Sequence, residues 1–184
     1  MVERKEQNMK NIISLHTPLT LHTIENLKCG DFVEITGTIY TARDAAHKAM
    51  VDLIRQDLPI PFDLKGQVIY YAGPCPAKPG QIIGSIGPTT SGRMDAYAPF
   101  LIERGLSGMI GKGSRNQHVV DAMVKHKCVY FGATGGAGAL LAQCVKSAEV
   151  IAFEDLGTEA VRKLYVERFP ILVVIDSRGN SMYK

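Results

Sequence analysis

The sequence predicts a single α/β domain with a largely parallel central sheet and a β-rich N-terminal part. Beyond residue 31, short apolar segments of strand length alternate with segments whose apolar residues recur at helical spacing. Such alternation is typical of strand–helix–strand crossovers between parallel strands. The first 40 residues lack helix signals. A chain of 184 residues is long enough for one domain with a sizeable core.

The first half of the chain alternates between the two kinds of segment. The turn Lys28-Cys29-Gly30 leads into the first predicted strand, and Asp44 is placed to cap the first predicted helix. Gly105 marks the end of the second helix. The predicted elements are a strand over 31–40, a helix over 45–55, strands over 68–72 and 82–86, and a helix over 94–102.

The second half continues the alternation. Asn116 and Thr158 are expected to cap two of its helices, because each precedes apolar residues at helical spacing. The predicted elements are a strand over 108–110, a helix after Asn116, a strand over 128–131, a helix over 137–146, a strand over 150–153, a helix after Thr158 and a strand over 171–175.

Composition argues against two classes of partner. The net charge is only +3, and the lysines and arginines are scattered, whereas nucleic-acid-binding domains concentrate them in a basic stripe. Residues 1–10 are polar and predict a flexible tail before a domain over 11–184, and no apolar signal-peptide core follows them. The longest apolar stretch, 171–175, is too short to span a membrane. We therefore expect a cytoplasmic protein that binds neither nucleic acid nor membrane.

The four cysteines do not form a metal-binding pattern. Their positions are Cys29, Cys75, Cys128 and Cys144, and none forms a Cys-x-x-Cys pair. Zinc and ferredoxin-type sites depend on such close spacings. We expect no metal site within this chain.

Polar residues gather where predicted strands lead into helices. In open α/β sheets, ligands bind at these junctions, beyond the carboxyl ends of the strands. Arg43 lies at one junction, the run 87–95 (Gly-Pro-Thr-Thr-Ser-Gly-Arg-Met-Asp) at a second, Lys112 at a third, and the glycine-rich turn 132–138 at a fourth. Three cations with neighbouring hydroxyls suit a small dicarboxylate. The alternative interpretation is that exposed loops collect arginine and lysine without binding anything.

Other motifs fit less well. Lys112 has neither the glycine six residues before it nor the following Ser or Thr of a phosphate-binding loop. The glycine-rich turn places Leu141 where a dinucleotide fingerprint needs its third glycine, although Glu154 follows the next predicted strand. His47 is either a proton carrier or a structural histidine.

Four segments together carry a family resemblance. Thr41–Lys48, Gly87–Asp95, Gly111–Gly113 and Gly132–Gly138 resemble, in this order, the C-terminal region of class I iron–sulfur fumarate hydratases. In two-subunit fumarases and in L(+)-tartrate dehydratase the same region is a separate beta subunit. The resemblance extends from about residue 11 to residue 175.

The resemblance implies a swivelling β/β/α domain and a hydro-lyase, which reversibly hydrates fumarate to (S)-malate. It makes Thr89 the residue that transfers the proton at carbon. The residues that bind the substrate carboxylates would be Arg43, Arg93 and Lys112. The candidate supporting residues are Thr90, His47, Gly135 and Gly136.

The family's cluster-binding cysteines lie in an N-terminal region that has no counterpart in this chain. The resemblance therefore implies a [4Fe–4S] cluster bound by a separate alpha subunit, in a heterotetramer of two alpha and two beta subunits. Fumarate and L(+)-tartrate both stay open as substrates. A nucleotide-binding domain and a non-catalytic regulatory or assembly subunit remain as alternative functions.

Overall fold

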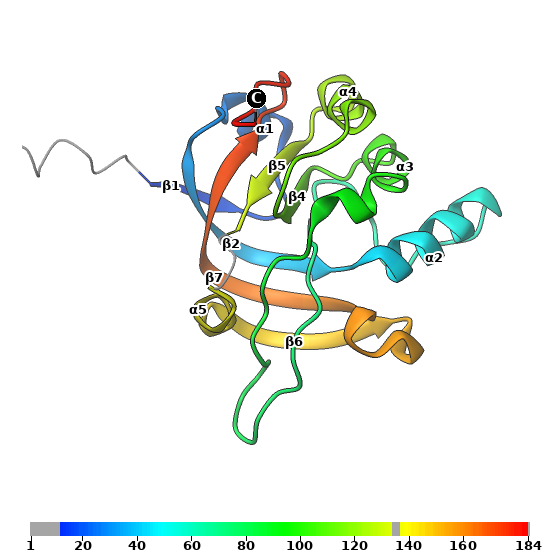
Figure 1. Ribbon diagram of the computed structural model, residues 1–184, viewed down its shortest axis with the longest axis vertical. Coiled ribbons are helices and arrows are strands. Elements are labelled where there is room, and N and C mark those ends of the chain that lie inside the picture. The colour runs from blue at the N-terminus through cyan, green and yellow to red at the C-terminus, as the bar shows by residue number, and fades with distance from the viewer. Residues whose placement is uncertain (1–11, 134–136, 184) are drawn as a thin grey trace, which may run out of the picture.

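The computed structural model describes residues 12–133 and 137–183. They fold into a mixed α/β domain, in which strands curve around one another and helices cover one side (Figure 1). In chain order the elements are β1 (Ile13–His16), α1 (Leu21–Asn26), β2 (Phe32–Thr41), α2 (Asp44–Arg55), β3 (Val68–Tyr70), the 3-10 helix η1 (Ser91–Met94), α3 (Ala98–Glu103), β4 (Gly108–Gly111), α4 (Gln117–His126), β5 (Val129–Gly132), α5 (Gly138–Gln143), β6 (Val145–Ala152), the 3-10 helix η2 (Glu154–Glu159) and β7 (Val161–Ile175).

The strands form one sheet in the order β1-β2-β3-β4-β5-β7-β6. Neighbours from β1 to β5 are parallel, which confirms the predicted parallel sheet. By contrast, β7 runs antiparallel to β5, to β6 and also to β2. Because β7 pairs with both β5 and β2, the strands β2, β3, β4, β5 and β7 form a closed ring of neighbours. The sheet therefore folds back on itself, and the antiparallel strands lie across the parallel ones.

Two apolar cores separate three layers. Side chains alternate across a strand, so Tyr70 of β3 joins the core between the parallel and antiparallel strands, whereas Ile69 joins the core beneath the helices. Phe131 and Tyr130 of β5 divide in the same way. The helices α2, α3 and α4 cover the second core (Figure 1). The result is the β/β/α layer order that the resemblance implies.

Most predicted elements are confirmed within a few residues, including the strands at 31–40, 68–72, 108–110 and 128–131 and the helix at 45–55. At the start of that helix the predicted cap is wrong by one position. Arg43 is the N-cap residue of α2, and Asp44 is its first helical residue. Asn116 is the N-cap residue of α4, as predicted.

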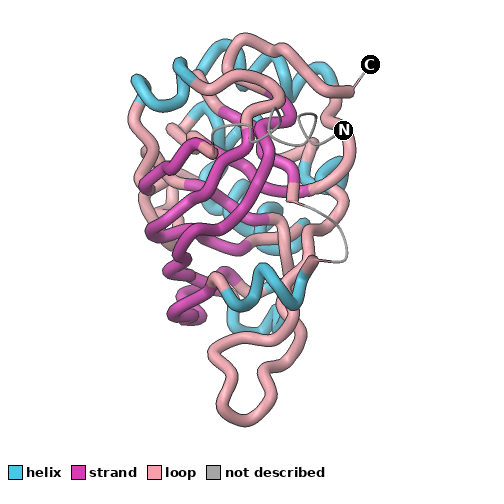
Figure 2. Tube along the Cα trace, turned by 90° about the vertical axis from the view of Figure 1, so that its left-hand side faces the viewer, coloured by secondary structure: helices cyan, strands magenta, loops and turns pink. Residues whose placement is uncertain are grey.

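Three predictions about secondary structure are wrong. The segment 82–86 is not a strand but part of a long loop between β3 and η1, which projects from the body of the domain (Figure 2). The loop contains several prolines and glycines, which interrupt strand pairing. The segment after Thr158 is not a helix but the start of the 15-residue strand β7. Buried and exposed residues alternate from Leu164 to Val166, and the alternation begins again at Phe169, after a bulge next to Arg168. The N-terminal part does contain a helix, α1, whose N-cap hydroxyl on Thr20 accepts a hydrogen bond from the Thr23 amide.

Candidate functional site

The predicted site residues share one edge of the parallel sheet. Arg43 follows the carboxyl end of β2, Lys112 follows the end of β4, and the glycine-rich turn follows the end of β5. Thr89 reaches the same edge because its amide donates a 2.6 Å hydrogen bond to the carbonyl of Tyr71, just after β3. Since β2, β3, β4 and β5 are neighbours, the structure places the four predicted clusters at consecutive strand ends.

Thr89 and Thr90 belong to residues 87–91, the threonine segment, which is held between β3 and β4. Thr90 forms a parallel bridge with Lys112. The Lys112 amide donates to the carbonyl of Thr89 at 3.4 Å, and the Ser91 amide donates to the carbonyl of Lys112 at 2.9 Å. These bonds extend the sheet beyond its regular strands. The side chain of Thr89 is consequently half-buried beside the Lys112 backbone, whereas Thr90 is exposed.

Two of the predicted cations have no competing partner in the part of the chain that the structure describes. Arg93, in the 3-10 helix η1, and Lys112, after β4, are both exposed. Within residues 12–133 and 137–183, neither side chain forms an ion pair or hydrogen bond. Two unneutralised cations beside a hydroxyl are suited to an anion with two charged groups.

Arg43 differs from these two cations. Its guanidinium lies 2.9 Å from a carboxylate oxygen of Glu159 and 3.8 Å from one of Asp44. The other oxygen of Glu159 accepts a 3.3 Å hydrogen bond from the Ala45 amide at the start of α2. Sequence analysis missed Glu159, because the pair joins residues far apart in the chain and no local motif marks it. A substrate carboxylate at Arg43 would have to share or replace the Glu159 contact.

His47 is structural in this geometry. The imidazole is fully buried, its Nδ1–H donates a 2.8 Å hydrogen bond to the carbonyl of Arg43, and its ring meets Tyr71 edge-on. Burial lowers the pKa of His47 to about 4, and the nearby Arg115 charge acts in the same direction. The ring is therefore neutral at pH 7, and its bond fixes the backbone turn that carries Arg43.

The buried histidine predicts a loss of stability in mild acid. Its pKa is 6.5 when unfolded and about 4 when folded, so the unfolded chain binds the extra proton as the pH falls through this window. The free energy of unfolding should drop by about 2 kcal/mol between pH 7 and pH 5. Urea unfolding at the two pH values measures this drop, and His47→Gln should remove most of it. An equal drop in wild type and variant would contradict the assignment.

The glycine-rich turn packs closely against the projecting loop. A Cβ on Gly138 would lie 2.9 Å from the backbone nitrogen of Gly87, which is closer than real Cβ atoms approach. The start of α5 therefore abuts the beginning of the threonine segment. Gly135 and Gly136 lie outside the described residues.

Comparison with known proteins gives the family. The family model described as Fumarase C-terminus matches residues 1–184. The chain belongs to the fumarase C-terminus family. It is 43% identical over 154 residues to "Fumarate hydratase class I, anaerobic" of Escherichia coli (strain K12). The aligned region covers 83% of this chain and 28% of that relative. It is 42% identical over 156 residues to "Fumarate hydratase 2" of Leishmania major, covering 84% of this chain and 28% of that protein.

One relative of similar size is matched over most of its length. The fumarase C-terminus chain is 40% identical over 172 residues to "Putative L(+)-tartrate dehydratase subunit beta" of Methanocaldococcus jannaschii, which covers 90% of this chain and 88% of that protein. By contrast, it spans only 28% of the length of the two fumarate hydratases. It thus corresponds to one region of a longer enzyme or to one separate subunit.

The cysteines of this fumarase C-terminus chain are poorly placed to hold an iron–sulfur cluster. Cys128 is buried, Cys75 is exposed on the projecting loop, and the Cys29 thiol donates to the carbonyl of Val174. Among the residues that the structure describes, no three His, Cys, Asp or Glu side chains gather as metal ligands. The donor set does not fit a cluster.

Two cavities border the projecting loop. One, of about 630 Å³, lies between this loop and α5, and the other, of about 510 Å³, between the loop and β6 with η2. Neither is lined by Thr89, Arg93 or Lys112. These residues lie at the sheet edge, outside both cavities. Separately, none of the described helices is long and apolar enough to cross a membrane.

Proposed function

We propose that this chain is the beta subunit of a class I iron–sulfur hydro-lyase that reversibly hydrates fumarate to (S)-malate in the cytoplasm. The observation that carries the proposal is the threonine segment bound between β3 and β4, with the exposed cations Arg93 and Lys112 next to it along the chain and across the bridge. The names of the relatives support the same reaction.

In this mechanism the cations bind the two carboxylates of the substrate. Arg93 can grip one carboxylate through two parallel N–H bonds, whereas Lys112 acts as a point charge. Removal of the proton from carbon places negative charge on the adjoining carboxylate, and fixed cations stabilise that charge in the transition state. Arg43 is a third candidate ligand, provided that a carboxylate displaces Glu159.

Thr89 is the proposed proton carrier at carbon. A free threonine hydroxyl is a very weak acid, and nearby positive charge favours its deprotonated form. The Lys112 backbone amide already bonds to the Thr89 carbonyl, so the two residues are adjacent. The hydroxyl can then exchange the proton with carbon while the cations hold the substrate still.

The cluster belongs to another polypeptide in this proposal. Class I fumarate hydratases are iron–sulfur enzymes, yet the cysteines described here do not gather. We propose that a separate alpha subunit binds the [4Fe–4S] cluster, in a heterotetramer of two alpha and two beta subunits. The match over 90% of this chain and 88% of a relative named as a beta subunit supports this division.

L(+)-tartrate is the second candidate substrate, because the relative matched over 88% of its length is named as a tartrate dehydratase subunit. The alternatives are separated by assaying the chain co-expressed with its cluster-bearing partner, under anaerobic conditions, on each diacid. Turnover of fumarate with little turnover of L(+)-tartrate supports the first proposal, and the reverse supports the second. Turnover of neither would favour a nucleotide-binding or non-catalytic subunit.

A further inference from the structure

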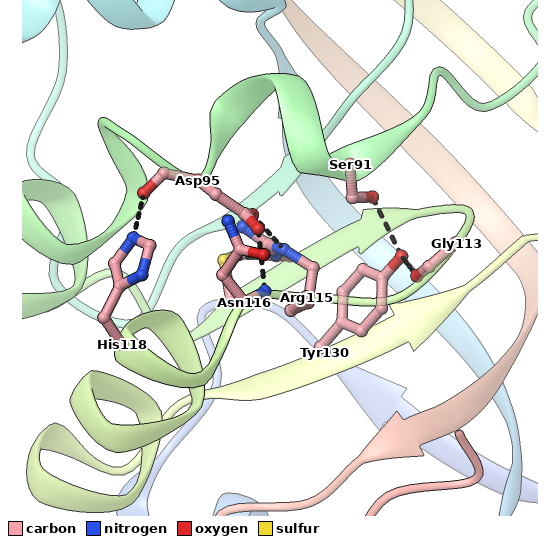
Figure 3. A network of polar contacts seen from close by, with 8 residues as sticks. Ser91, Asp95, Gly113, Arg115, Asn116, His118 and Tyr130 are labelled. Atoms are coloured by element: carbon pink, nitrogen blue, oxygen red, sulfur yellow. Dashed lines mark hydrogen bonds and ion pairs between the residues drawn. The ribbon is translucent and has the colours of Figure 1, made fainter. Parts of the chain in front are cut away.

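A buried ion pair lies beneath the candidate site. Asp95 and Arg115 have side chains only 3% and 0% exposed, and the Arg115 Nε–H donates to Asp95 at 2.7 Å (Figure 3). The other oxygen of Asp95 accepts a 2.8 Å bond from the Asn116 amide. The carbonyl of Asp95 accepts a 3.0 Å bond from His118. Asp95 is thus bound to three points on the segment 115–118.

A second connection passes through Tyr130 of β5. Its hydroxyl donates to the carbonyl of Gly113 at 2.8 Å and lies 2.8 Å from the Ser91 hydroxyl (Figure 3). Because a tyrosine hydroxyl has one proton, the Ser91 hydroxyl donates to Tyr130. Burial raises the pKa of Tyr130, so this hydroxyl stays protonated. The Arg115 guanidinium lies over the Tyr130 ring, 5.0 Å from its centroid, which joins the two connections.

The network links the two loops that carry the candidate site. Ser91 and Asp95 flank Arg93, and Ser91 is two residues from Thr89. On the other loop, Gly113 and Arg115 follow Lys112. A Cβ on Gly111 would overlap the Ser91 hydroxyl oxygen, so the two loops are also in close contact. The side chains of this network therefore add two connections to the backbone bonds that join Thr89 and Ser91 to Lys112.

Stability alone is a poor explanation for this network. A buried ion pair costs as much in desolvation as it gains, and apolar side chains of similar size are often as stable. What the network does supply is one fixed geometry.

We propose that Tyr130, Ser91, Asp95 and Arg115 are positioning residues, which hold Thr89 and Arg93 at a fixed distance from Lys112. This inference rests on the proposed function, since the distance matters only if one diacid contacts both loops. A misplacement of 1 Å at a reacting group can lower the rate by about 10²-fold. A network that touches no substrate can therefore control the rate.

The test uses the chain co-purified with its cluster-bearing partner. Tyr130→Phe and Ser91→Ala each remove one hydroxyl, and Asp95→Asn removes the charge. The matched control is Ser177→Ala, whose buried hydroxyl bonds to the carbonyl of Ile24 instead. We expect Tyr130→Phe and Ser91→Ala to lower kcat/KM by about 10- to 100-fold, mainly through kcat, with losses of Tm similar to that of the control.

Amide hydrogen exchange supplies a readout that does not need activity. Loss of one hydrogen bond should raise exchange about 2- to 10-fold in residues 87–97 and 108–117 of Tyr130→Phe and leave the other strands unchanged. If Asp95→Asn does not fold, the hydroxyl variants still decide the matter. Unchanged exchange in these segments, or altered exchange with wild-type kcat/KM, would overturn the inference. An inactive wild-type assembly would instead refute the proposed function, while exchange would still show whether the network joins the loops.

Discussion

Thr89→Val should lower kcat by about 10²–10⁴, the usual contribution of a general acid–base group. Valine keeps the size and β-branching of threonine and removes only the hydroxyl. The backbone bonds that hold this residue between Tyr71 and Lys112 use its amide and carbonyl, so they survive the change. We therefore expect small effects on KM and Tm. Steady-state kinetics of the assembled enzyme with the diacid measures the effect.

Thr90→Val is the matched control, because it removes the same group from the adjacent residue. Thr90 is exposed at the N-cap position of η1, where its side chain makes no capping hydrogen bond. We expect this variant to keep most of kcat and to lose little stability. If Thr90→Val were the inactive variant, the assignment within the pair would be reversed. If neither variant lost tenfold in kcat, the proton carrier would lie on the partner.

The second large effect is expected at the exposed cations Arg93 and Lys112. A hydrogen bond to a charged group contributes about 1.5–3 kcal/mol, so Arg93→Ala and Lys112→Ala should each lower kcat/KM by about 10- to 150-fold. Arg93→Lys should be nearly as harmful as Arg93→Ala if the arginine binds a carboxylate bidentately. Both side chains are exposed, so Tm should change little. Kinetics at several diacid concentrations separates binding from turnover.

Exposed cations elsewhere supply the control for net charge. Lys146→Ala removes one positive charge from an exposed residue of β6, and we expect wild-type kcat/KM. Near-wild-type kcat/KM for Arg93→Ala would show that this arginine is only a surface residue. Arg43→Ala is less informative, because it also leaves Glu159 without its ion-pair partner.

Local patterns predicted the parallel half of the fold better than the antiparallel half. The strands that become β2 to β5 are short apolar segments between helices, and their neighbours in the sheet follow chain order. In contrast, β7 pairs with three strands. The apolar residues Val161, Leu164 and Tyr165 have the spacing of a helix face, yet in the structure Leu164 is buried and its neighbour Tyr165 is exposed, as in a strand. The pairing with β2 and β6 decides its conformation, and sequence periodicity does not record such long-range pairing.

The candidate site shows the same division. Junction residues such as Arg43 and Lys112 could be placed at one sheet edge, because parallel strands end together. The side chains that contact the site residues could not be predicted in this way. Glu159 is far from Arg43 in the sequence, and Tyr130, which bonds to Ser91, lies 39 residues after it. The Ser91 hydroxyl, part of the same local run as Thr89 and Arg93, donates into the buried network. Side-chain pairing of this kind depends on tertiary packing, which no local spacing encodes.

The central claim is that this chain supplies diacid-binding and proton-transfer residues to a site that its partner completes. The most direct measurement is the anaerobic rate of fumarate hydration while this chain is titrated into a fixed amount of the cluster-bearing partner. We predict no hydration by either component alone, a rate that rises to a plateau at one chain per partner, and a plateau at least about 100-fold lower with Thr89→Val. Full hydration by the partner alone, or by this chain alone, would contradict the account.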